Sequence, residues 1–264
     1  MPGGDWRRCA RASWLILSLR PIRSKSPKEN DVRIGIITFP GSNGDWDCYY
    51  ALREIPGFEP VMIWHKERDL HGVSALILPG GFAHGDYLRA GAIARFSPIM
   101  HEVTRFASEG RPVIGICNGF QILTEAHLLP GALIRNKSLL FRCSLVHVRV
   151  KSNRSPWLSS LREGEVLRLA IAHGQGNYFA DQETLNYLLE NDMVALQYCG
   201  PNGEVTPEFN HNGSVMSIAG ITNEAGNVLG LMPHPERSAD QLLGSADGRR
   251  IFMSLAVALK EVFV

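Results

Sequence analysis

The sequence predicts an α/β fold in which helices cover both faces of a mixed, mostly parallel sheet. The main observation is that short runs of β-branched residues alternate with longer amphipathic stretches along the chain. A second observation is that several of these runs end in glycine-rich turns, such as Pro40–Gly44 and Pro79–Gly81. With 264 residues, of which 45% are hydrophobic, the chain can bury one sizeable core. We therefore expect a single α/β domain.

In the first half of the chain, predicted strands and helices alternate, which implies right-handed crossovers and a doubly wound sheet. Apolar runs bounded by turn signals predict strands at residues 34–39, 61–64, 74–78 and 112–116. Amphipathic stretches predict helices at residues 45–55 and 120–127, and helical periodicity dominates from residue 82 to Glu109.

The second half of the chain is richer in candidate strands. These strands are expected at residues 145–150, 166–172, 194–198, 215–219 and 228–232. The pair Asn202-Gly203 is a strong hairpin signal between two of them. An amphipathic helix is expected over residues 249–264.

The first 31 residues differ from the rest of the chain. Seven of the 27 basic residues but only two of the 26 acidic residues fall within residues 1–30, so the basic excess belongs to this segment. We interpret residues 1–31 as a leader, disordered or produced by a misassigned start, with a transit peptide as the alternative. Residues 32–264 form the expected domain. The net charge near zero gives no case for a nucleic-acid partner, and no apolar run is long enough to span a membrane.

Cys117 lies in the segment with the clearest chemical signal. A predicted strand ends at Ile116 and a helix follows at once, so Gly115-x-Cys117-x-Gly119 has the form of a nucleophile elbow with cysteine in place of serine. Glycines on both sides allow the strand and helix backbones to approach closely. The helix N-terminus favours a thiolate, and the amide of Asn118 points to the same space. A buried structural cysteine is the alternative, but this strand–turn–helix setting favours a nucleophile.

A proton carrier for this thiol is expected at His234. Met232 and His234 each precede a proline, which favours extended backbone there. Since residues i and i+2 of an extended segment lie on one face, we expect Glu236 to orient the imidazole of His234 toward Cys117. A surface histidine beside a solvated glutamate is the alternative.

The remaining motifs include one candidate anion site and several informative absences. The glycines at 80 and 81 follow a predicted strand, and their N–H groups suit an oxyanion, although a plain turn explains them equally well. The chain contains no Gly-Lys pair and hence no phosphate-binding P-loop. Its five cysteines include no C-x-x-C pair and its histidines lack metal-site spacing, so we expect no metal and favour a reducing, cytoplasmic setting.

Taken together, these segments resemble the class I glutamine amidotransferases and, within them, the free-standing glutaminase subunits of phosphoribosylformylglycinamidine synthase. The resemblance covers about residues 33–248 and is carried by the segments at residues 39–43, 78–82, 85–97, 115–123, 129–133, 141–143, 171–174 and 232–237. It implies a flavodoxin-like fold in which Cys117 is the nucleophile, His234 is the general base and acid, and Glu236 orients His234.

The same resemblance implies how substrate and partners are bound. The amides of Gly81 and Asn118 resemble an oxyanion hole, and Gln121 and the His173-Gly174 backbone resemble contacts to glutamine. Hydrolysis of glutamine through a cysteine thioester would then deliver ammonia to a large synthetase subunit, assisted by a small accessory subunit, in purine biosynthesis. ATP and Mg are expected on that partner, and no cofactor is expected in this chain.

Two other functions remain open at this point. The first is a stand-alone cysteine hydrolase on the same fold, of the γ-glutamyl hydrolase or peptidase type, which needs no partner. The second is an inactive relative that serves as a structural subunit, although the presence of Cys117, His234 and Glu236 speaks against it.

Overall fold

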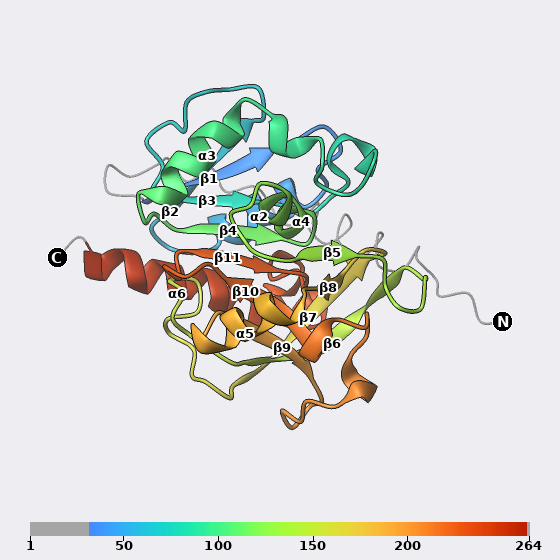
Figure 1. Ribbon diagram of the computed structural model, residues 1–264. Coiled ribbons are helices and arrows are strands. Elements are labelled where there is room, and N and C mark those ends of the chain that lie inside the picture. The colour runs from blue at the N-terminus through green and yellow to red at the C-terminus, as the bar shows by residue number, and fades with distance from the viewer. Residues whose placement is uncertain (1–31, 263–264) are drawn as a thin grey trace.

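A mixed nine-stranded sheet runs through the molecule in the order β2-β1-β3-β4-β11-β10-β9-β6-β7 (Figure 1). The computed structural model describes residues 32–262, so our interpretation of residues 1–31 lies outside the described residues. The strands of this sheet are β1 (Val32–Thr38), β2 (Phe58–Trp64), β3 (Ala75–Leu78), β4 (Val113–Ile116), β6 (Arg142–Val150), β7 (Val166–His173), β9 (Val194–Cys199), β10 (Ile218–Thr222) and β11 (Val228–Leu231). Strands β5 (Ala132–Ile134) and β8 (Asn177–Phe179) form a separate antiparallel pair.

The sheet has a parallel half and an antiparallel half. Strands β2, β1, β3, β4 and β11 pair in parallel. From β11 onward every pairing is antiparallel, with β10 and β6 running opposite to the other strands. Every residue of β3, β4 and β11 is buried, as expected for central strands covered on both faces. The predicted α/β fold with a mixed sheet is therefore confirmed.

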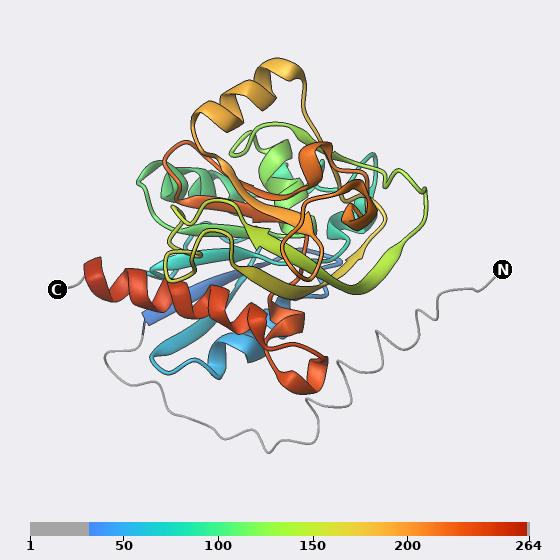
Figure 2. The same cartoon turned by 90° about the horizontal axis from the view of Figure 1, so that it is seen from below.

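Helices cover both faces of the sheet (Figure 2). The α-helices are α2 (Asp45–Arg53), α3 (Ile99–Ser108), α4 (Asn118–Glu125), α5 (Gln182–Glu190) and α6 (Asp247–Val262). Helices α2 and α6 lie on one face, while α4 packs against β3, β4 and β11 on the other. Among the described residues, none of the helices has the length and apolar character that crossing a membrane requires.

The register of the central strands brings three loops to one edge of the sheet. Leu78 of β3 pairs with Gly115 of β4, and Leu231 of β11 pairs with Ile116 of β4, so these parallel strands end side by side. The N–H of Cys117 donates to the carbonyl oxygen of Leu231 at 2.8 Å, which ties the β4 and β11 ends together. In open α/β sheets this carboxyl edge is where ligands bind.

The prediction of helical structure from residue 82 to residue 98 is wrong. Two short 3-10 turns, η1 (Ala83–Asp86) and η2 (Ala94–Phe96), occupy it, and α3 begins only at Ile99. The rest of this segment is irregular because tertiary hydrogen bonds hold it. For example, the guanidinium of Arg95 donates to the carbonyl oxygen of Glu125 at the end of α4.

Three further differences lie in the second half. Residues 215–217 form a 3-10 turn, η4 (Val215–Ser217), so strand β10 begins only at Ile218. Gly203 does adopt a turn, with φ of +88°, but another 3-10 turn, η3 (Pro207–Phe209), lies between it and β10, so the turn is not a two-residue hairpin. Helix α5 was not predicted, although the Asp181 carboxylate accepts the N–H of Thr184 as a recognisable N-cap.

Candidate active site

Cys117 lies on a strained turn between β4 and α4. Its backbone has φ of 52° and ψ of −102°, which a residue with a Cβ rarely adopts. A Cβ on Gly115 would lie 2.5 Å from the Cδ1 of Leu123, and a Cβ on Gly119 would collide with the carbonyl oxygen of Leu78. These glycines therefore permit the close strand-to-helix turn that the elbow pattern predicts.

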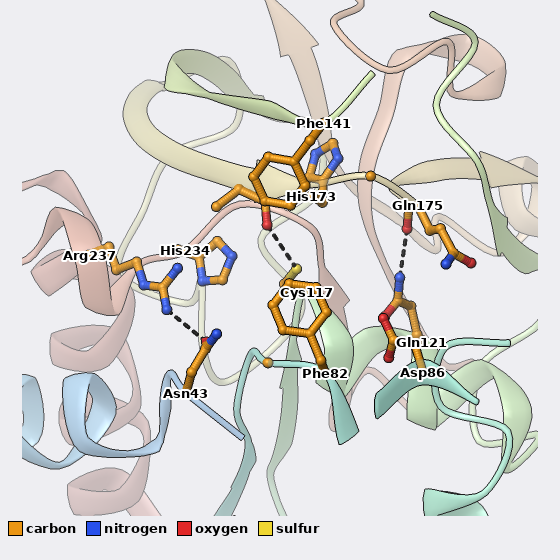
Figure 3. A pocket seen from close by; sticks show the side chains of 13 residues that line it. Asn43, Phe82, Asp86, Cys117, Gln121, Phe141, His173, Gln175, His234 and Arg237 are labelled. Atoms are coloured by element: carbon orange, nitrogen blue, oxygen red, sulfur yellow. Dashed lines mark hydrogen bonds between the residues drawn. The ribbon is translucent and has the colours of Figure 1, made fainter. Parts of the chain in front are cut away.

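The Cys117 side chain lines a pocket at the carboxyl edge of the sheet, although only 5% of the residue is exposed. Its thiol is free, and the sulfur lies 3.8 Å from the carbonyl oxygen of Ala172 (Figure 3). The pocket is lined by Asn43, Gly81, Phe82, Asp86, Cys117, Gln121, Phe141, Ala172, His173, Gly174, Gln175, His234 and Arg237. Six of the eight residues singled out from the sequence are among them.

His234 and Glu236 form a buried hydrogen-bonded pair. The Nδ1 of His234 lies 2.5 Å from the Oε1 of Glu236. Because a carboxylate oxygen accepts, Nδ1 donates and Nε2 is left for another partner. Nε2 is buried and has no hydrogen-bond partner among the described residues. The sequence therefore predicted the pairing of His234 with Glu236, and the structure leaves Nε2 available for proton transfer.

The route by which the chain forms this pair differs from our expectation. The N–H of His234 donates to the carbonyl oxygen of Ala170 at 2.7 Å, in an isolated antiparallel bridge to β7. Pro235 then turns into right-handed helical geometry, and Glu236 begins the 3-10 turn η5 (Glu236–Ser238). The carboxylate thus reaches the imidazole around a turn and not along an extended segment.

The electrostatics of the pocket favour a charged imidazole. Complete burial opposes a charge on His234, but the neighbouring Glu236 carboxylate and Cys117 outweigh it and raise the pKa of His234 to about 9. The ring therefore carries its proton at neutral pH.

Two backbone N–H groups are available for an oxyanion, one on Gly81 in the pocket lining and one on Asn118 directly after Cys117. Within residues 32–262, the N–H groups of Gly81 and Asn118 have no hydrogen-bond acceptor. Gly80, which precedes Gly81, makes room for the imidazole, because a Cβ at this position would lie 2.6 Å from the Cε1 of His234. The two glycines after β3 thus leave room for the imidazole and keep a donor free.

A polar network lines the other side of the pocket. The Nδ2 of Asn118 donates to the Oε1 of Gln121 at 2.8 Å, and the Nε2 of Gln121 donates to the carbonyl oxygen of Gln175 at 2.6 Å. In Figure 3, His234 and Arg237 lie on one side of Cys117, while Gln121 and Asp86 lie on the other. The pocket therefore extends away from the imidazole toward polar side chains.

His173 and Gly174 also line this pocket. The His173 ring is buried, and its Nδ1 lies 3.2 Å from the Oδ1 of Asn136. Burial, with a contribution from His234, lowers the pKa of His173 to about 3, so this ring stays neutral. The neutral His173 leaves His234 as the imidazole suited to proton transfer.

Sequence reasoning assigned no role to an arginine that braces the catalytic turn. The Nε of Arg237 lies 3.0 Å from the Oδ2 of Asp47 on α2 and 3.8 Å from the Oε1 of Glu236. Its Nη2 donates to the Oδ1 of Asn43 at 2.9 Å. Arg237 thereby ties the turn that carries Glu236 to the loop after β1. The signal was present in the sequence, because Arg237 directly follows the His-Pro-Glu motif.

Asp86, Phe82, Phe141 and Gln175 also line the pocket without having been singled out. They lie in the segments that follow β3, precede β6 and follow β7. Within the part of the chain that the structure describes, no group of three or more His, Cys, Asp or Glu side chains could hold a metal ion.

A family comparison agrees with this geometry. Residues 31–250 match the model of the CobB/CobQ-like glutamine amidotransferase domain. The chain therefore belongs to this family of glutamine amidotransferases.

Individual relatives narrow the comparison. The chain is 55% identical over 231 residues to the phosphoribosylformylglycinamidine synthase subunit PurQ of Chlorobium chlorochromatii, an alignment covering 88% of this chain and 99% of that protein. It is 54% identical over 224 residues to the subunit of the same name from Moorella thermoacetica, covering 85% and 95% of the two chains.

Solved structures show the same likeness. A chain in the structure of PurLQS from Thermotoga maritima is 42% identical with a TM-score of 0.76, covering 87% of this chain and 99% of that one. A second protein from Thermotoga maritima, described as a glutamine amidotransferase, shares the fold at 18% identity and a TM-score of 0.50. That alignment covers 88% of this chain and 83% of the other.

Proposed function

We propose that this chain is the glutaminase subunit of phosphoribosylformylglycinamidine synthase. It hydrolyses glutamine to glutamate and ammonia, and passes the ammonia to a partner synthetase in purine biosynthesis. The carrying observation is that Cys117, His234 and Gly81 line one pocket, and that the unpartnered N–H of Asn118 directly follows Cys117. The phosphoribosylformylglycinamidine synthase subunit PurQ of Chlorobium chlorochromatii is 55% identical to this chain in an alignment that covers 99% of that protein. This likeness supports the particular reaction.

The first half-reaction forms a thioester. The Cys117 sulfur attacks the side-chain carboxamide carbon of glutamine, and the carbonyl oxygen becomes an oxyanion that the Gly81 and Asn118 N–H groups stabilise. The Nε2 of His234 gives its proton to the carboxamide nitrogen. The carbon–nitrogen bond then breaks, ammonia leaves, and a glutamyl thioester remains on Cys117.

The second half-reaction restores the enzyme. His234, now neutral, takes a proton from a water molecule that attacks the thioester carbon, and the carbon–sulfur bond breaks to release glutamate. Because the pKa of His234 is raised to about 9, its ring begins each cycle protonated. The acid needed for ammonia release is therefore in place before substrate binds. Glu236 holds the ring through Nδ1 and so leaves Nε2 for these proton transfers.

The fate of the ammonia defines the partners. Ammonia released to neutral water is protonated and ceases to be a nucleophile, so an acceptor site must receive it directly. The sequence has no P-loop, so ATP and Mg belong to the partner. We assign that role to a large synthetase subunit, accompanied by a small accessory subunit, within the cytoplasm. The likeness to a chain of PurLQS from Thermotoga maritima supports an assembly of this kind.

Reconstitution of the complex tests the proposal. Glutaminase activity of the chain is measured alone and with the synthetase and accessory subunits, using ATP and formylglycinamide ribonucleotide as co-substrates. Strong stimulation of glutamine hydrolysis by the partners, coupled to product formation, is expected. Full hydrolysis by the isolated chain with no coupling would instead support a stand-alone hydrolase, and no thioester formation in any state would support a structural subunit.

A further inference from the structure

The pocket carries an acidic side chain that the proposed mechanism does not use. Asp86 lies on the side away from His234, beside Gln121 (Figure 3). Among the described residues that line the pocket, it is the only acidic one. Its Oδ1 accepts a long hydrogen bond of 3.3 Å from the Nδ2 of Asn118. Within residues 32–262, no lysine, arginine or histidine nitrogen lies within ion-pair distance of this carboxylate.

The turn that carries Asp86 has a strained backbone, and its course directs the Asp86 side chain toward the pocket. His84, Gly85 and Asp86 adopt φ values of 54°, 71° and 52°, so three successive residues are left-handed. Such geometry persists only where the surroundings hold it, and it concentrates at ligand sites. Here the N–H of His84 donates to the carbonyl oxygen of Pro40 at 2.7 Å, and the N–H of Ala83 donates to the Oδ1 of Asn118 at 2.9 Å.

The side chains at this strained turn differ sharply in their exposure. Asp86 is partly buried against the pocket, whereas the next two residues, Tyr87 and Leu88, are 71% and 82% exposed. Burial raises the pKa of Asp86 to about 6, and the Asn118 hydrogen bond only partly opposes this rise. The carboxylate is thus mostly ionised at neutral pH, while the pocket provides it with one weak donor and no cation.

We propose that Asp86 binds the α-ammonium group of the substrate glutamine and so selects an α-amino acid over other primary amides. The inference rests on the proposed glutaminase function. With the carboxamide carbon at Cys117, the amino-acid end of glutamine must occupy the far side of the pocket, where Asp86 lies. An ammonium group would complete the missing charge pair, and such charge-assisted hydrogen bonds are among the stronger polar contacts.

A substrate analogue separates this role from a structural one. The probe is 4-carbamoylbutanoate, which is glutamine without its α-amino group. It is tested on the reconstituted complex both as a substrate and as an inhibitor of glutamine hydrolysis. For Asp86→Asn we expect kcat/KM for glutamine to fall by about 10- to 100-fold, mainly through KM. The constants for 4-carbamoylbutanoate are expected to change less than about threefold, so the preference for glutamine collapses.

Two controls accompany this measurement. Asp69→Asn makes the same chemical change at an exposed carboxylate outside the pocket, and it should leave both substrates unaffected. The Asp86→Asn chain should co-elute with the synthetase and accessory subunits on gel filtration as the unaltered chain does, which shows that the variant folds and assembles. The KM for glutamine of the unaltered enzyme should also rise as pH falls below 6, and this rise should be absent in Asp86→Asn.

The outcomes distinguish the possibilities. Equal losses toward glutamine and the analogue would overturn the inference, because Asp86 would then act only by positioning Asn118. An unchanged preference for glutamine would overturn it as well. If the unaltered complex failed to hydrolyse glutamine at all, the proposed function itself would fail.

Discussion

The two sides of the pocket are built by different means. On the catalytic side, Cys117 and His234 each follow a central strand, and β4 and β11 end in register beside each other. On the far side, Asp86 lies on an irregular loop whose course depends on hydrogen bonds to Pro40 and to the Asn118 side chain. Reactive atoms therefore follow fully buried central strands, while the group that we assign to substrate selection lies on a loop with strained backbone.

This difference leads to distinct expectations for substitutions. Changes on the catalytic side should lower kcat for every primary amide, because they act on bond making and proton transfer. Changes on the far side should alter KM and the preference among substrates. The Asp86 experiment tests the far side. Four experiments test the catalytic side, and they follow from the largest expected effect to the smallest.

Removal of the nucleophile should have the largest effect. Cys117→Ser is expected to lower glutamine-dependent synthesis by roughly 10⁴-fold, since removing one member of a catalytic unit costs about this much. Ammonia-dependent synthesis by the same complex should be retained. A diazo-ketone analogue of glutamine should label Cys117 and leave the buried thiols of Cys48 and Cys199 unlabelled, as mass spectrometry can establish. Parallel loss of both synthetic activities would refute the division of labour.

Crowding of the imidazole should have the next largest effect. In Gly80→Ala the new Cβ would meet the Cε1 of His234 at 2.6 Å, so the ring must move away from the sulfur. A displacement of this size is expected to cost about 10²- to 10³-fold in kcat for glutamine. Steady-state kinetics of the complex provide the measurement. A Cβ on Gly57 meets nothing within 4 Å, so Gly57→Ala, although strained by the φ of +88°, should leave kcat unchanged, and equal losses of kcat in both variants would contradict the prediction.

Removal of the carboxylate behind the imidazole should have a smaller effect with a characteristic pH dependence. Glu236 is a main cause of the raised pKa of His234, so Glu236→Gln should lower that pKa and reduce kcat by about 10²-fold at neutral pH. The unaltered enzyme should lose activity as pH rises past about 9, where the ring gives up its proton. In Glu236→Gln this alkaline limb should move to lower pH. An unmoved limb would mean that another group controls it.

The same titration should contribute a small effect on stability. Because the pKa of His234 rises from 6.5 to about 9 on folding, the charged ring stabilises the folded state fully below pH 6.5. That stabilisation is lost as pH rises from 6.5 to about 9, by roughly 1–3 kcal/mol. Urea denaturation at pH 6.5 and 9.5 measures it, and His234→Gln should reduce the difference. If the stability of His234→Gln depended on pH as strongly as that of the unaltered chain, this explanation would be ruled out.

The catalytic side was predictable because its signals are local. The pattern Gly115-x-Cys117-x-Gly119 encodes a strand that turns at once into a helix, and the glycines are needed whatever the rest of the fold does. His234 and Glu236 lie two residues apart, so their contact was also within reach of sequence reasoning. Even here the reason for the contact was mistaken, because Pro235 turns the chain where extended backbone was expected.

The far side could not be predicted in the same way. Residues 82–98 have helical periodicity in the sequence, yet hydrogen bonds to Pro40, Asn118 and Glu125 hold them in an irregular path. The acceptor atoms lie far away in the chain and become neighbours only after the sheet has formed. Arg237 bridges Asp47, Asn43 and Glu236 for the same reason.

The sequence by itself therefore determined the α/β class, the identity of the nucleophile turn and the pairing of an imidazole with a carboxylate. These features depend on periodicity, glycine sterics and spacing, which act over a few residues. Only the tertiary structure decided which strands end side by side, and hence that the thiol, the imidazole and the free N–H of Gly81 border one pocket. It also decided that Asp86 lies within that pocket with no cation at ion-pair distance among residues 32–262, because burial and charge pairing are set by contacts between distant segments.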